Sequence, residues 1–91
     1  MEQKSQQEIL YKKNYKHFRK ILFERYGITL NFQDYVNLHS IKLSRVVLQA
    51  DKRSFQGFII INEMAVKVIK SRYGKGNPLV TVLHLKIKDL N

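Results

Sequence analysis

The stretch SFQGFIIINEMAVKVIK, residues 54–70, decides the fold because two apolar segments in it are separated by one short polar turn. Residues 54–61 and 64–70 are rich in Val and Ile, which are enriched in β-strands. A connection as short as Asn62–Glu63 joins antiparallel neighbours, so the stretch predicts a β-hairpin. Because the run from Phe58 to Ile61 is apolar at every position, we expect that part of the strand to be buried on both faces.

Two further strands extend this hairpin. Residues 44–50 precede it across a turn at residues 51–53, and residues 79–87 follow it across a turn at residues 73–78 that contains two glycines and the single proline. Connections this short favour antiparallel neighbours that are adjacent in the sheet. The sequence therefore predicts a four-stranded antiparallel β-meander.

Upstream of the sheet the apolar pattern changes to that of helices. In residues 5–26 one helical face carries Leu10, Tyr11, Tyr15, Phe18, Ile21, Leu22 and Tyr26. Gly27 suits the residue that follows a helix end. Residues 31–40 predict a second, short helix capped by Asn31, with His39 near its end, where a protonated imidazole would suit the helix dipole. We therefore expect a single α+β domain over residues 1–91, with two N-terminal helices packed on the four-stranded meander.

The net charge is the strongest indication of function. Seventeen Lys and Arg face seven Asp and Glu, which gives a formal charge of +10 on 91 residues. Such a surplus in a small folded domain is typical of proteins that meet a polyanion. We expect the partner to be nucleic acid or a nucleoprotein complex. An acidic protein partner is the alternative.

The basic residues concentrate in two regions. One side of the first helix carries Lys12, Lys13, Lys16, Arg19 and Lys20, a row that suits a phosphate backbone, although a solvated lysine-rich face is the alternative. The strand turns contribute Lys52, Arg53, Lys70 and Lys75. Ile9 and Phe23 lie among the helix cations, so we expect them either to touch a second element or to be exposed for contact with a protein partner.

Several chemistries are excluded by what the sequence lacks. There is no cysteine and no His-xxx-His spacing, so we expect no metal site and no cofactor. The acids are scattered, which argues against a two-metal nuclease, and no P-loop occurs. We expect no association with a membrane, because no run approaches the roughly 20 apolar residues of a membrane span, and we expect a cytoplasmic protein.

Metal-independent RNA cleavage survives this exclusion, since it needs only Lys, Arg, His or Tyr side chains. Tyr73, beside Arg72, offers a ring for base stacking. His84 alternates with Val80 and Val82, so it is either a general acid or base or a buried core residue.

In its order of elements and its charge, the chain resembles the RelE-like and barnase-like ribonuclease toxins, and also small phage and mobile-element proteins of related shape. The stretches that carry the resemblance are Glu24-Arg25-Tyr26-Gly27-Ile28, residues 64–69 and residues 79–83. The resemblance implies cleavage by Lys, Arg, Tyr or His side chains on the sheet and its loops. Arg72, Tyr73 and His84 are of these types.

The function that we expect is association with RNA, DNA or a nucleoprotein complex through the basic helix face, without catalysis. Small phage-borne inhibitors of host machinery act in this way. A metal-independent ribonuclease of the toxin type is one alternative, and a basic subunit that binds an acidic protein is another.

Overall fold

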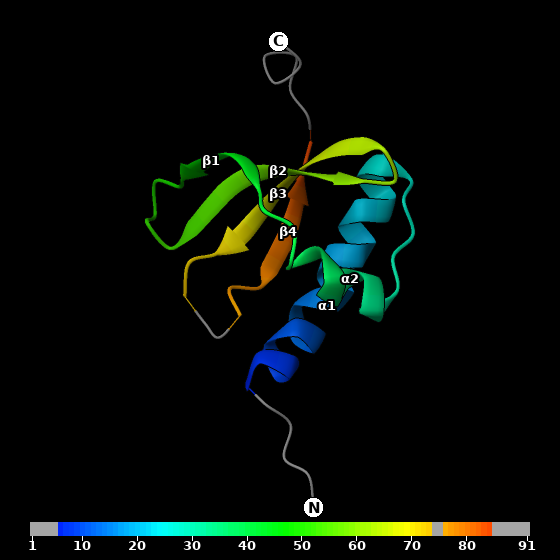
Figure 1. Cartoon of the computed structure of the whole chain (residues 1–91), viewed down its shortest axis with the longest axis horizontal. Coiled ribbons are helices and arrows are strands. Elements are labelled where there is room, and N and C mark those ends of the chain that lie inside the picture. The colour runs from blue at the N-terminus through cyan, green and yellow to red at the C-terminus, as the bar shows by residue number, and fades with distance from the viewer. Residues whose placement is uncertain (1–5, 74–75, 85–91) are drawn as a thin grey trace, which may run out of the picture.

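The computed structural model describes residues 6–73 and 76–84, and it has the predicted α+β architecture, with helices preceding an antiparallel sheet (Figure 1). The elements are α1 (Gln6–Tyr26), α2 (Phe32–Leu38), β1 (Ser44–Leu48), β2 (Ser54–Ile61), β3 (Met64–Ser71) and β4 (Leu79–Leu83). The sheet order β1-β2-β3-β4 confirms the meander. The second helix is shorter than expected, with seven residues, and β1 ends two residues early. Residues 5, 75 and 85–87, which we had assigned to elements or sites, lie outside the described residues.

The central hairpin forms as predicted. β2 and β3 pair without interruption from Ser54↔Ser71 to Ile61↔Met64. The two residues between the strands, Asn62 and Glu63, have φ angles of 49° and 66°. Positive φ at both central residues is the geometry that two-residue hairpin loops require, because its twist matches that of the strands.

The expectation that residues 58–61 are buried on both faces is wrong. Ile59 and Ile61 are buried, but the side chain of Ile60 between them is 60% exposed. Ile60 and its cross-strand partner Ala65 are both exposed, so this part of the sheet is open on one face. The uninterrupted apolar run of residues 58–61 therefore does not mean that both faces of the sheet are covered there.

The outer strand β1 is exposed along its whole length. Its regular pairing with β2 is interrupted between Ser44 and Val47, where Arg45 adopts a φ of 51°. Val46, Val47 and Leu48 are 50%, 58% and 41% exposed. β1 is thus an edge strand with apolar side chains in solvent, and its bulge keeps the edge irregular.

The core lies between α1 and the sheet. Phe18 and Leu22 of α1 are fully buried together with Val66, Val68 and Val82, which confirms the predicted apolar helix face. In Figure 1, α1 runs alongside β4 at the edge of the sheet opposite β1.

Hydrogen bonds attach the end of α1 to β4. Arg25 Nη1 donates to the carbonyl of Val82 at 2.8 Å, and the hydroxyl of Tyr26 donates to the carbonyl of Leu83 at 2.7 Å. The same hydroxyl accepts the backbone N–H of Lys67 at 3.3 Å, so it bridges β3 and β4. Gly27 follows with a φ of 68°, the left-handed helix end that the sequence predicted.

The short helix α2 is held to the sheet by contacts with both backbone groups of Leu79. The hydroxyl of Tyr35 donates to the Leu79 carbonyl at 2.6 Å, and the Leu79 N–H donates to His39 Nε2 at 2.9 Å. We call this arrangement of Tyr35, His39 and Leu79 the Leu79 clamp. The ring of Tyr11 stacks on the His39 imidazole, with centroids 4.0 Å apart.

The clamp requires His39 to be neutral. Because Nε2 accepts the Leu79 N–H, the imidazole proton lies on Nδ1, which donates to the Tyr35 carbonyl at 2.9 Å. The expectation of a protonated imidazole at this helix end is therefore wrong. Burial lowers the pKa of His39 below its ordinary value, and the Lys70 ammonium lowers it further, while the hydrogen bond to Tyr35 opposes both.

We predict that the clamp makes stability pH-dependent. Below about pH 6.5 the unfolded chain binds a proton at His39 that the folded chain excludes, so the free energy of unfolding falls as the pH is lowered from 7.5 to 5. The contribution of one proton reaches at most about 1.4 kcal/mol per pH unit. Urea denaturation across this range should show the decline in the wild type and a weaker one in His39→Gln. Equal slopes in the two proteins would contradict the prediction.

Candidate nucleic-acid interface

The five predicted cations of α1 are all exposed and line two adjoining hollows in the surface. The first, of about 790 Å³, is lined by Lys12, Lys13, Tyr15, Lys16, Arg19 and Phe32. The second, of about 420 Å³, is lined by Lys16, Arg19, Lys20, Phe23, Glu24, Thr29 and Leu30. Because Lys16 and Arg19 belong to both, we treat the hollows as one feature, the α1 groove.

Aromatic residues form the floor of the first hollow and are fixed in place. The hydroxyl of Tyr15 donates to the Leu30 carbonyl at 2.8 Å, and its ring meets that of Phe32 edge to face at 5.4 Å. The guanidinium of Arg19 lies 5.6 Å from the centre of the Tyr15 ring. A hydrogen bond, a ring contact and a cation–π contact thus hold Tyr15 and orient Arg19 before any ligand arrives.

The charges of the groove are largely uncompensated. Between described residues the structure contains one ion pair, in which Lys12 Nζ lies 3.6 Å from a Glu8 carboxylate oxygen. Lys13, Lys16, Arg19 and Lys20 have no carboxylate partner in the described part of the chain. Glu24 is the one carboxylate that lines the groove. A polyanion placed there would meet several cations that need not first break an existing ion pair.

The structure resolves the alternatives left open for Ile9 and Phe23. Their side chains are 51% and 58% exposed, so neither is covered by a second element. Phe23 lines the second hollow beside Lys20, and it therefore belongs to the basic groove. The sequence signal for this placement was an apolar residue one helical turn from cations, and contact with a protein partner stays a prediction for both residues.

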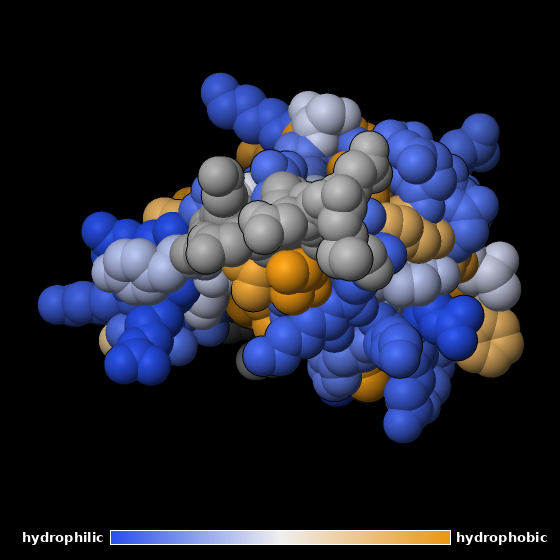
Figure 2. Space-filling view, turned by 90° about the horizontal axis from the view of Figure 1, so that it is seen from below, coloured by the Kyte–Doolittle hydropathy of each residue, from blue (hydrophilic) through white to orange (hydrophobic). Residues whose placement is uncertain are grey.

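A second basic surface forms where the strand turns meet, and we call it the hairpin-tip patch: Lys52, Arg53, Arg72 and Tyr73. The backbone N–H of Arg72 donates to the Arg53 carbonyl at 2.9 Å, and its Nη1 donates to the Lys52 carbonyl at 3.2 Å. The Arg72 guanidinium lies 5.5 Å from the centre of the Tyr73 ring. Seen from below, hydrophilic side chains protrude both at the helical side and at the strand-turn side of the molecule (Figure 2). Because Lys52, Arg53 and Arg72 are exposed in the hairpin-tip patch, positive charge is not confined to α1.

The three candidate catalytic residues do not form one site. Arg72 and Tyr73 follow β3, whereas His84 follows β4, and the pairs Lys67↔Leu83 and Lys70↔Leu79 show that these are opposite ends of the ladder. At about 3.3 Å per residue, His84 lies roughly 20 Å from Tyr73. His84 is exposed and follows the last residue of β4, so the alternative that it is a buried core residue is wrong.

Other classes of site find no support. Among residues 6–73 and 76–84, no three His, Asp or Glu side chains are grouped so that they could hold a metal ion. Neither helix there combines the length and apolarity that crossing a membrane requires.

Comparison of the chain with protein-family models, with curated proteins and with solved structures found no match in any of the three.

We predict that the phenylalanines of α1 differ sharply in their effect on stability. Phe18 is fully buried and Phe23 is 58% exposed. Phe18→Leu should lower the free energy of unfolding by about 1–2 kcal/mol because the smaller side chain leaves a gap in the core. Phe23→Leu should change it by less than about 0.5 kcal/mol. Chemical denaturation measures both, and a comparable loss in Phe23→Leu would mean that its ring is part of the core.

Proposed function

We propose that the chain binds nucleic acid along the α1 groove. The observation that supports this most directly is that four exposed cations without carboxylate partners among the described residues line a groove whose floor is aromatic. Phosphate contacts from Lys and Arg supply most of the affinity in sequence-independent binding. The remaining cations of the chain would add a general attraction that falls with salt.

The dimensions of the groove suit a short stretch of strand. From Lys12 to Lys20 the helix rises about 12 Å at 1.5 Å per residue. A single strand that keeps the stacked rise of duplex DNA, about 3.4 Å per phosphate, places about three phosphates along this length. The four cations without ion-pair partners thus suffice for the phosphates within reach.

The aromatic residues favour an unpaired strand over a duplex. Phe23 is exposed beside the cations, and a base can stack on its ring only when that base is not already stacked in a duplex. Base–aromatic stacking contributes about 1–3 kcal/mol per base and tolerates any base, because every base has a flat face. We therefore propose single-stranded RNA or DNA as the preferred ligand, bound without strong sequence preference.

The proposal is one of binding without cleavage. Arg72 and Tyr73 adjoin each other, but His84 lies at the other end of β4, so the three candidate catalytic residues do not act together. The proposal therefore uses the resemblance to ribonuclease toxins only in architecture and charge, and it does not extend the resemblance to catalysis. A protein of this kind would act by occupying a strand or a nucleoprotein surface, as an inhibitor of host machinery does. An acidic protein that presents carboxylates at similar spacing would compete for the same groove.

We predict a salt-dependent affinity that depends on α1. For a labelled single-stranded 20-mer, log K should fall with log[salt] with a slope near −3, about −0.7 for each of four cations. Lys16→Gln with Lys20→Gln should weaken binding at least ten-fold and make the slope less negative by about 1.4. The matched control, Lys52→Gln with Arg53→Gln, removes the same charge from the hairpin-tip patch and should have a clearly smaller effect. Fluorescence anisotropy between 50 and 200 mM salt measures all three proteins.

Three outcomes would count against this proposal. Equal losses in the two double variants would indicate general charge attraction, and a larger loss in the control would move the site to the hairpin-tip patch. Duplex bound as tightly as single strand, with Phe23→Leu unchanged, would remove the stacking argument.

A further inference from the structure

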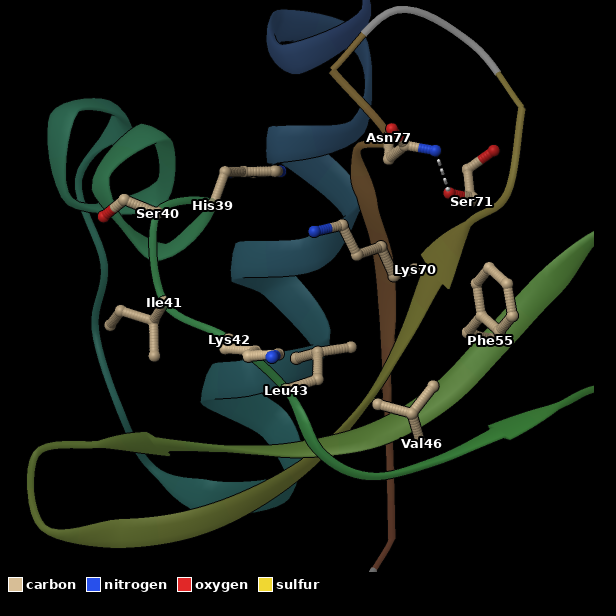
Figure 3. Close-up of a pocket in the computed structure, with 10 residues that line it drawn as sticks. All are labelled: His39, Ser40, Ile41, Lys42, Leu43, Val46, Phe55, Lys70, Ser71 and Asn77. Atoms are coloured by element: carbon tan, nitrogen blue, oxygen red, sulfur yellow. Dashed lines mark hydrogen bonds between the residues drawn. The ribbon is translucent and has the colours of Figure 1, made fainter.

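A third hollow lies away from the α1 groove and shares no lining residue with it. It has a volume of about 380 Å³ and lies between the connection from α2 to β1 and the adjoining ends of β2, β3 and β4 (Figure 3). Ile41, Leu43, Val46 and Phe55 form apolar walls, and Lys42 and Lys70 bring ammonium groups to it. We call it the Lys70 pocket. Its volume falls within the range of about 300–1,000 Å³ that is usual for small-molecule sites.

Lys70 occupies an unusual position in β3. The side chains of Val66 and Val68 point into the core, and Lys70 is the next residue on the same face, opposite Phe55 in the register. Its side chain is half-buried, and Figure 3 shows it directed into the pocket toward His39. No carboxylate or hydrogen-bond acceptor among the described residues contacts its ammonium group. An anion bound in the pocket would therefore meet this ammonium group without displacing an acceptor of the described chain.

The neighbouring side chains do not supply that anion. Both ring nitrogens of His39 are engaged in the Leu79 clamp, so the imidazole is neutral. Asn77 donates its amide to the backbone carbonyls of Ser71 and Arg72. No Asp or Glu among the described residues lines the pocket, while Lys42 adds a second ammonium group. In the part of the chain that the structure describes, the pocket thus carries two positive charges and no negative one.

We propose that the Lys70 pocket binds a nucleoside monophosphate, with its phosphate between Lys70 and Lys42 and its base against the apolar walls and the Phe55 ring. A phosphate monoester carries nearly two negative charges at pH 7, which matches two ammonium groups better than a single carboxylate does. Lysine acts as a point charge toward phosphate and needs no fixed planar geometry. The ligand is either a free nucleotide or the phosphorylated 5′ end of a strand. The site is independent of the α1 groove and does not require that the groove bind nucleic acid.

The test is a titration of the full chain with AMP, followed by NMR chemical shifts and by calorimetry. We expect saturable binding, with the largest shifts at residues 39–43, 46, 55 and 70. Adenosine, which lacks the anion, and inorganic phosphate, which lacks the base, should each bind at least ten-fold more weakly. Lys70→Met keeps an unbranched side chain of nearly the same length and removes a half-buried charge, so it should fold and should weaken AMP binding at least ten-fold. Lys52→Met removes the same charge from the hairpin-tip patch and should stay within two-fold of the wild type.

Equal affinity for AMP and adenosine, shifts confined to the α1 groove, or wild-type affinity in Lys70→Met would each overturn the proposal. Lys42→Met, at an exposed position where folding is not at stake, should also weaken AMP binding. Two oligonucleotides that differ only in a 5′ phosphate distinguish a free nucleotide from the phosphorylated 5′ end of a strand as the ligand. A preference for the phosphorylated strand that Lys70→Met abolishes assigns the pocket to strand ends, and AMP binding without that preference assigns it to free nucleotides. If the proposal for the α1 groove is wrong, oligonucleotide binding should instead be unchanged in Lys16→Gln with Lys20→Gln.

Discussion

The Leu79 clamp is the interaction on which both proposed sites depend. A helix of seven residues is too short to be stable alone in water, so α2 must be held by tertiary contacts. Tyr35 and His39, one turn apart, bind the carbonyl and the N–H of the first residue of β4. The N-terminal residue of α2, Phe32, contributes to the floor of the α1 groove, and the chain that leaves α2 forms a wall of the Lys70 pocket. Loosening the clamp would therefore disturb both surfaces at once.

Much of the fold could be predicted because its signals are local. Val and Ile at alternate positions, a two-residue turn and the aromatic face of α1 specify the hairpin and the first helix through neighbours in sequence. The errors arose where distant residues decide. The exposure of Ile60 depends on which face the helices cover, and the neutral state of His39 depends on the N–H of Leu79, forty residues away. No local pattern around either residue carries that information.

The same division applies to the surfaces. The α1 cations could be predicted because helical spacing alone places them in one row. The groove could not, since its floor needs Phe32 and Leu30 from the segment that folds back on α1. Lys70 was recognised as basic, but its significance lies in following Val66 and Val68 on the buried face of β3, which becomes informative only once that face is known. His84 was misplaced because the strand ends one residue before it.

The exposed valines of β1 have a consequence for how copies of the chain behave together. An edge strand with exposed apolar side chains can pair with the edge strand of another chain and so promote aggregation. The bulge at Arg45 disrupts such pairing only locally. The charge of +10 adds a long-range repulsion between molecules that acts before such edges can meet. Neutralising that charge with a bound polyanion removes the barrier to self-association. The same surplus of positive charge would then keep free molecules apart in solution and let molecules bound to one shared strand cluster.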